Sequence, residues 1–337
     1  MSELPELIKT LLDPQAYPAP PPSVELVQTQ ISFVFLAGDY VYKIKKPVDL
    51  GFLDYSTLEK RLTFCIKELE LNRRLCPDAY LEVVPVTDDD GRIVMDGRGE
   101  VKEYAVKMRR LPREGMMDVL LTKNKVTPAM LARVAAILAG FHQRAETNAA
   151  ISAFGNLDTI TKNTVEENFG QTEKYVGTII PREKYQHLKD YTSGFLEINA
   201  PLFRKRVADG RIRDCHGDLH AAHICFTNGI CIYDCIEFID RLRYTDVAAD
   251  VAFLAMDLDH YGRADLSDSF INAYVKESGD EELKELLDFY KCYRACVRGK
   301  VGCFQYDDPY ISSKEKGRIL ANTRSYFELA ESYTEKI

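Results

Sequence analysis

The 337-residue chain lacks the long apolar runs and the basic surplus that mark membrane proteins and nucleic-acid-binding proteins. No unbroken apolar stretch is long enough to cross a bilayer, so we expect no membrane span. Lysine and arginine total 44 against 52 aspartate and glutamate residues. The net charge of −8 disfavours nucleic acid as a partner, because phosphate backbones select basic surfaces. With 46% apolar and 28% charged residues, the composition is that of a globular protein.

Targeting and metal-binding cysteine patterns are also missing. The N-terminal stretch MSELPELIKTLLDPQ has neither the basic segment nor the apolar core of a signal peptide. We therefore expect a cytoplasmic protein whose nine cysteines are reduced thiols. No CxxC spacing occurs among Cys215, Cys225, Cys231 and Cys235. This spacing favours four buried strand thiols over a zinc site.

The secondary-structure pattern changes near Pro112. Before it, a short amphipathic helix over 2–12 and a proline-rich stretch precede β-branched and aromatic runs, with a hairpin turn expected at Gly38–Asp39. A helix is predicted over Ser56–Leu75, with Ser56 or Thr57 as its N-terminal cap, and two strands follow it. After Pro112, a helix over Pro128–Arg144 and further helices flank one hairpin-like segment, 215–238. We therefore predict an α+β protein with a lead-in (1–22), a β-rich N-lobe containing one helix (23–107) and a mainly helical C-lobe (108–337).

The segment HGDLHAAHICFTNGICIYD carries two carboxylates in a setting that suits phosphoryl transfer. Asp218 follows His216 and Gly217 in a loop, whereas Asp234 ends an apolar strand-like run. In phosphoryl transfer one carboxylate accepts the proton of the attacking hydroxyl, and another holds Mg²⁺ against the nucleotide phosphates. Positioning and charge neutralisation are most of what this reaction needs.

This segment resembles the catalytic loop and metal-binding segment of the aminoglycoside phosphotransferase and choline kinase superfamily, HGDxxxxN…ID. Stretches such as VYKIKKPVDLGFLDYSTLEKR, ELELNRRL and DCIEFIDRLRYTDVAADVAFLAMDLD are similar to an uncharacterised bacterial branch, and they extend over roughly residues 23–261. The resemblance implies a bilobal protein-kinase-like fold. It also implies transfer of the γ-phosphate of ATP or GTP, with Mg²⁺, to a hydroxyl of a small molecule. No GxxxxGK[ST] occurs, so the second, P-loop activity of some relatives is not expected.

The resemblance assigns roles to individual residues of the second lobe. It implies Asp218 as catalytic base and Asp234 as metal ligand, with His216 bracing the loop. It matches Asp246 to the aspartate that anchors the catalytic loop from a following helix. The pattern breaks at His223, where the family has asparagine as its second metal ligand. An imidazole nitrogen suits a softer metal than Mg²⁺, which prefers oxygen.

Nucleotide contacts are expected from the strand VYKIKK, the helix after it and the connector, namely Val41, Lys43, Lys45, Glu68 and Met108. Side chains alternate along a strand, so Val41, Lys43 and Lys45 share one face. Val41 is the apolar residue expected above adenine, and Lys43 stands two positions after it. Lys43 is therefore the favoured phosphate anchor, with Lys45 as the alternative. Glu68 is its predicted ion-pair partner and Glu70 is the fallback. The connector would contact adenine through its backbone.

Two other functions compete with the phosphotransferase. A kinase-like nucleotide-binding or regulatory protein with impaired catalysis would account for His223. A metallohydrolase could use the HxDxHxxH cluster of His216, Asp218, His220 and His223, but such centres need further ligands from distant loops. The order of lysine strand, glutamate helix, HGD loop and strand-end aspartate favours the kinase-like interpretation. The fold selects neither the acceptor nor the oligomeric state.

Overall fold

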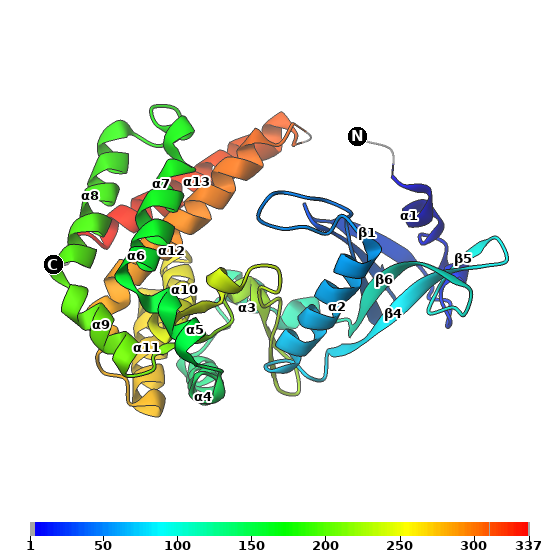
Figure 1. The fold of residues 1–337 in the computed structure, drawn as a ribbon, viewed down its shortest axis with the longest axis horizontal. Helices are drawn as coiled ribbons and strands as arrows, with labels where there is room; N and C mark the ends of the chain where they lie inside the picture. Colours follow the sequence, from blue (N-terminus) through cyan, green and yellow to red (C-terminus); the bar gives the residue numbers. More distant parts are fainter. Residues whose placement is uncertain (1–3, 310, 336–337) are drawn as a thin grey trace. The chain divides into compact units, whose positions relative to one another are not determined.

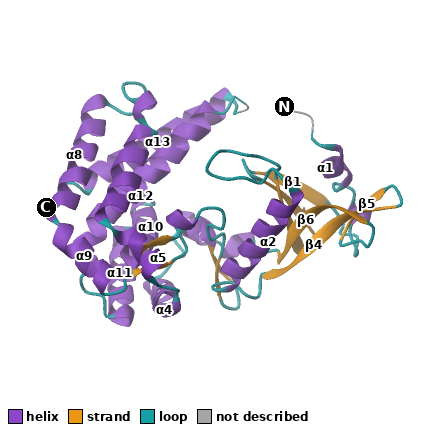
Figure 2. Ribbon diagram, viewed as in Figure 1, coloured by secondary structure: helices purple, strands orange, loops and turns teal. Residues whose placement is uncertain are grey.

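The computed structural model describes residues 4–309 and 311–335, which form two compact units. The first contains the described residues up to Val119 together with Ala222–Asp240; the second contains Leu120–Ala221 and the described residues from Arg241 onward. The first is built on a sheet and the second on helices (Figures 1 and 2). This confirms the predicted α+β fold class, with one β-rich part and one mainly helical part. The boundary expected between residues 107 and 108 stays a prediction, and the segment 222–240 belongs to the sheet unit although it lies far along the chain.

A six-stranded antiparallel sheet forms the centre of the first unit, in the order β1-β2-β3-β6-β4-β5. Its strands are β1 (Val24–Gln28), β2 (Ser32–Ala37), β3 (Tyr40–Lys45), β4 (Tyr80–Asp89), β5 (Arg92–Met95) and β6 (Glu100–Arg109). The predicted hairpin between β2 and β3 is present, and Gly38 has the positive φ of 62° that its tight turn requires.

Helix α2 (Leu58–Arg73) packs on β6 and β4 (Figure 1). The Thr57 side chain, one of the two predicted candidates, caps its N-terminus by accepting a hydrogen bond from the Lys60 backbone N–H. Its buried face carries Glu68 and Asn72 beside Cys65, so the Glu68 carboxylate lies in the interior of the unit. The N-terminal helix is shorter than predicted: α1 spans Glu6–Thr10, and a 3-10 turn follows at Pro14–Ala16.

The hairpin of β8 (Ile224–Phe226) and β9 (Ile230–Ile232) completes the first unit. Cys231 on β9 forms a disulfide with Cys76, which lies beyond the end of α2; the two Cα atoms are 4.7 Å apart across 155 residues of sequence. The expectation that every cysteine is a reduced thiol is therefore wrong for this pair. Cys215, Cys225 and Cys235 are buried thiols outside any disulfide, as expected, but of these three only Cys225 lies in a strand.

The second unit is a helical assembly in which α10 is the most deeply buried helix. Its helices are α4 (Pro128–Arg144), α5 (Ala149–Ser152), α6 (Leu157–Thr161), α7 (Asn168–Gly170), α8 (Arg182–Ile198), α9 (Ala200–Ala208), α10 (Val247–His260), α11 (Ala264–Ser278), α12 (Leu283–Asp307) and α13 (Ser313–Ser332). The short helix α3 (Met117–Thr122) runs across the division of the chain between the two units. Helix α4 has the predicted bounds and packs on α11, while α12 packs on α10 and α13. Strands β7 (Ile212–Asp214) and β10 (Tyr244–Asp246) pair at the N-terminal end of α10.

Among the described helices, none is both long enough and apolar enough to span a membrane.

Candidate active site

Two lysines of β3 converge on one buried carboxylate of α2. Lys43 Nζ lies 2.8 Å from Glu68 Oε1, and Lys45 Nζ lies 2.7 Å from Glu68 Oε2. Because strand side chains alternate, residues 43 and 45 point to the same side of the sheet, toward α2. The two lysines differ in access: the Lys43 side chain keeps 15% exposure, whereas that of Lys45 is fully buried. Glu70, the fallback partner, is exposed.

This cluster holds its charges in the ionised state. Burial disfavours the ionised form of Glu68, yet the attraction of Lys43 and Lys45 outweighs burial and keeps its pKa below the ordinary value. Burial likewise opposes the charge on Lys43, but Asp234 and Glu68 raise its pKa well above the ordinary value. The pair is thus an ion pair at neutral pH, as a phosphate-anchoring lysine and its orienting glutamate require.

Asp234 joins the same cluster from the segment after β9. Its Oδ1 lies 2.9 Å from Lys43 Nζ, and its Oδ2 lies 3.5 Å from His223 Nε2. The backbone of Asp234 is left-handed, with φ of 61°, a conformation that non-glycine residues adopt rarely. Two groups fix this bend: the Tyr80 hydroxyl accepts from Asp234 N at 3.4 Å, and Asn72 Oδ1 accepts from Cys235 N at 2.9 Å.

A second buried network surrounds Lys45. Its ammonium also donates to Glu237 Oε1 and, at 3.3 Å, to the Tyr55 hydroxyl, which itself donates to Glu237 at 2.8 Å. Glu237 is 3% exposed and lies three residues after Asp234. Lys45 therefore ties the Asp234 segment to Glu68, and its burial separates its role from that of Lys43.

Val41 and Met108, the residues expected beside adenine, lie directly opposite each other in the β3–β6 register. Both belong to an apolar cluster that also contains Tyr80 and Tyr233. A nucleobase contact by these residues stays a prediction.

His216 and Asp218 belong to the second unit, in the loop between β7 and a 3-10 turn that begins at Ala221. The His216 ring accepts a hydrogen bond from Asp218 N through Nδ1 at 3.3 Å, which agrees with a bracing role. His220 Nε2 lies 3.6 Å from Asp218 Oδ2. The Asp218 side chain keeps 32% exposure, so its carboxylate stays within reach of solvent.

The loop is anchored by Asp250 rather than by Asp246. Asp250 accepts hydrogen bonds from His216 N at 3.0 Å and from Gly217 N at 2.9 Å. Asp246 instead caps α10 by accepting from Ala248 N, and it pairs with the buried Arg206. The expectation for Asp246 is therefore wrong. Asp246 is engaged by the helix cap and by Arg206, and the carboxylate one turn later accepts the loop amides.

Helices α4 and α12 add two contacts to this anchor that sequence reasoning did not assign. His142 lies 3.1 Å from Asp250 through Nε2 and 2.7 Å from the Tyr274 hydroxyl through Nδ1. Burial opposes ionisation of Asp250, but the His142 contact outweighs it and lowers the pKa of Asp250 to about 2. Arg294 donates to Gly217 O at 3.2 Å and to Ala249 O at 3.0 Å. A histidine and an arginine on otherwise buried helix faces were the only sequence signals for these contacts.

Comparison with known proteins places the chain in a family. Residues 68–286 match the phosphotransferase enzyme family. The chain belongs to this family. It is 36% identical to an uncharacterized protein of Mycobacterium tuberculosis over 286 residues, which covers 85% of this chain and 56% of the relative. The chain thus spans about half the length of the curated relatives it matches.

Solved structures agree on the fold. An ethanolamine kinase of Plasmodium vivax aligns with a TM-score of 0.52 at 12% identity, covering 93% of this chain and 83% of that one. An amicoumacin kinase in complex with AMP-PNP and Ca²⁺ aligns with a TM-score of 0.52 at 13% identity, covering 90% and 88% of the two chains. At such identities the likeness concerns the fold alone.

Proposed function

We propose that this protein transfers the γ-phosphate of ATP or GTP to a hydroxyl of a small molecule. Membership of the phosphotransferase family gives the reaction class. The observation that carries the finer assignment is the contact of Lys43 with both Glu68 and Asp234. Phosphoryl transfer by kinase-like proteins uses a strand lysine, a helix glutamate and a metal-binding aspartate in this combination.

In this proposal Lys43 contacts the nucleotide phosphates and Glu68 orients it. Lys45 acts as a positioning residue, because its buried ammonium holds Glu68 and Glu237 together. Val41 and the backbone at Met108 contact the adenine ring. Of the two lysines, only Lys43 has a side chain exposed enough to contact a ligand.

A divalent cation fits the donors that this segment offers. Asp234 Oδ2 and His223 Nε2 face each other at 3.5 Å, which provides one carboxylate oxygen and one imidazole nitrogen. Mg²⁺ prefers oxygen ligands, and a mixed oxygen–nitrogen set suits Mn²⁺ better. When bound, the ion neutralises charge on the nucleotide phosphates. We therefore propose Asp234 and His223 as the ligands of a divalent cation, Mg²⁺ or Mn²⁺.

Asp218 serves as the base in this proposal. Its carboxylate accepts the proton of the acceptor hydroxyl as the oxygen attacks the γ-phosphorus, and the nucleoside diphosphate leaves. The hydrogen bonds from His216 N and Gly217 N to Asp250 restrain the loop that carries Asp218. A fixed base contributes through position as well as basicity.

A nucleotide-binding protein with impaired turnover is the second candidate, and His223 is the observation that favours it. The two candidates separate in a binding and turnover experiment on the full chain. Under the first, ATP with Mg²⁺ or Mn²⁺ raises the melting temperature, and a hydroxyl acceptor screen detects ATP consumption. Lys43→Met should remove both effects. Stabilisation of the wild type without turnover on any acceptor would favour the second candidate, and absence of both would overturn the nucleotide-site assignment.

A further inference from the structure

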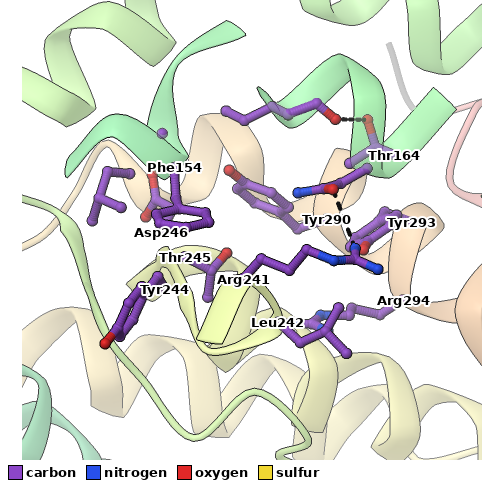
Figure 3. Close-up of a pocket in the computed structure, with 14 residues that line it drawn as sticks. Phe154, Thr164, Arg241, Leu242, Tyr244, Thr245, Asp246, Tyr290, Tyr293 and Arg294 are labelled. Atoms are coloured by element: carbon purple, nitrogen blue, oxygen red, sulfur yellow. Dashed lines mark hydrogen bonds between the residues drawn. The ribbon is translucent and has the colours of Figure 1, made fainter. Parts of the chain in front are cut away.

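A pocket in the second unit has a charge arrangement that the proposed reaction does not use. It is lined by residues of α12, of the turn and strand before α10, and of the short helical turns after α5 (Figure 3). Four of its side chains are aromatic rings, from Phe154, Tyr244, Tyr290 and Tyr293. Two are guanidinium groups, from Arg241 and Arg294.

The charged groups of this pocket are compensated unequally. Arg241 pairs with Glu167 at 2.8 Å, and Asp246 pairs with Arg206 at 2.6 Å, so both are neutralised by protein partners. Arg294 is only 5% exposed, and its hydrogen bonds go to two backbone carbonyls. Within residues 4–309 and 311–335, no carboxylate lies within ion-pair distance of Arg294.

A buried cation without a counter-charge is costly, and a ligand anion would offset the cost. Two ring faces, of Phe253 at 4.7 Å and Tyr293 at 5.6 Å, stabilise the Arg294 guanidinium in part. Its planar donor array suits carboxylate and phosphate oxygens, which it can bind with two parallel hydrogen bonds.

Arg294 also connects the pocket to the catalytic loop. It donates to the carbonyl of Gly217, the residue before Asp218. An anionic group held by Arg294 therefore lies next to the segment that carries the proposed base. A small acceptor anchored there by its anion could present a hydroxyl to Asp218.

We propose that this pocket binds the anionic group of the acceptor, which is thus a hydroxyl compound carrying a carboxylate or a phosphate. That the bound anion is the acceptor rests on the proposed phosphotransferase function. Anion binding by the pocket does not depend on turnover. It excludes choline-like cations and neutral alcohols as preferred ligands.

The test compares three ligands that share a three-carbon skeleton: neutral glycerol, glycerate with a carboxylate, and glycerol 3-phosphate. Calorimetric titration of the full chain without nucleotide should show one of the two anions binding at least roughly tenfold more tightly than glycerol. The anion that binds more tightly identifies the group. Choline serves as the cationic counterpart and should not bind.

Two variants locate the site. Arg294→Gln should abolish the preference for the anion. Arg294 also braces the loop, so its replacement can disturb the loop as well as the pocket. Asn163→Asp is therefore the second variant. It leaves the Arg294 hydrogen bonds intact and places a negative charge in the pocket lining beside Arg241. It should weaken anion binding by repulsion. Arg318→Gln, at a side chain of α13 with 79% exposure, is the control and should bind as the wild type does.

Equal affinity of the wild type for glycerol and both anions would overturn the proposal. So would an anion preference that survives in both pocket variants. Failure of the phosphotransferase function has a different signature: anion binding lost in Arg294→Gln, but no phosphate transferred to any ligand. Turnover with neutral or cationic acceptors and no anion binding would retain the function and reject this site.

Discussion

Replacing Lys45 with methionine should destabilise the protein far more than removal of an exposed ion pair. The Lys45 ammonium is fully buried and contacts two buried carboxylates, those of Glu68 and Glu237. Methionine fills a similar volume but leaves both carboxylates without this partner. Breaking a buried ion pair from one side costs about 3–5 kcal/mol, because the remaining charge is uncompensated. Glu68 keeps its contact with Lys43 at 2.8 Å, so the charge that Lys45→Met exposes to this cost is mainly that of Glu237.

A double-mutant cycle identifies the cause of this loss. In Lys45→Met/Glu237→Gln the Glu237 charge is removed together with its buried partner, so the combined cost should fall below the sum of the single costs by about 1–3 kcal/mol. The matched control is Lys60→Met. Lys60 pairs with Asp54 on the surface, where both side chains keep more than 40% exposure, and such pairs contribute about 0–1 kcal/mol.

Urea unfolding followed by circular dichroism measures these free energies, since the chain contains no tryptophan for fluorescence. Nucleotide affinity of the same variants shows whether Lys45 positions Glu68: affinity should fall in Lys45→Met and stay unchanged in Lys60→Met. If Lys45→Met costs no more than Lys60→Met, or if the double-mutant cycle shows no coupling, the positioning role is refuted.

Three further predictions concern acid stability, cysteine oxidation and metal preference. The pKa of Asp250 is about 2 against an ordinary 3.8, so about 2 kcal/mol of stability is present above the ordinary value and lost as pH falls toward 2. Urea unfolding from about pH 6 to about pH 2 should therefore show a steeper loss in the wild type than in Asp250→Asn, and equal slopes would contradict this. Thiol titration of unreduced, denatured protein should find seven free thiols, and nine would contradict the disulfide. Reduction of Cys76–Cys231 should lower the unfolding free energy by about 2–4 kcal/mol. His223→Asn should raise Mg²⁺-dependent turnover relative to Mn²⁺-dependent turnover in steady-state kinetics, and an unchanged ratio would remove His223 from the metal site.

Local sequence signals predicted the elements that carry the site. A cap at Ser56 or Thr57 and the helical spacing after it predicted α2, and strand alternation put residues 43 and 45 on one face. Placing Glu68 opposite the lysines followed from those two elements together with the kinase pattern. The helix and the strand faces are predictable because each depends on neighbours close in the sequence, whereas the placement of Glu68 depended on the resemblance to a known family.

Contacts between distant segments were not predictable in the same way. Asp246 and Asp250 are one helical turn apart, and only the folded chain shows that the second accepts the loop amides while the first caps the helix. The Cys76–Cys231 bond joins residues 155 positions apart with no spacing motif to mark it. Glu237 stands in an apolar run, CIEF, and its polarity there was the one available hint of the Lys45 network.

The proposed phosphotransferase reaction depends on Asp218 as its base. The most direct test measures γ-phosphate transfer from ATP across a panel of hydroxyl compounds, with nucleotide affinity measured in parallel, for the wild type and Asp218→Asn. Asp218→Asn should lower transfer by roughly 10²–10⁴-fold while the dissociation constant for nucleotide changes only a few-fold. Transfer that persists in Asp218→Asn at the wild-type rate would show that Asp218 is not the base.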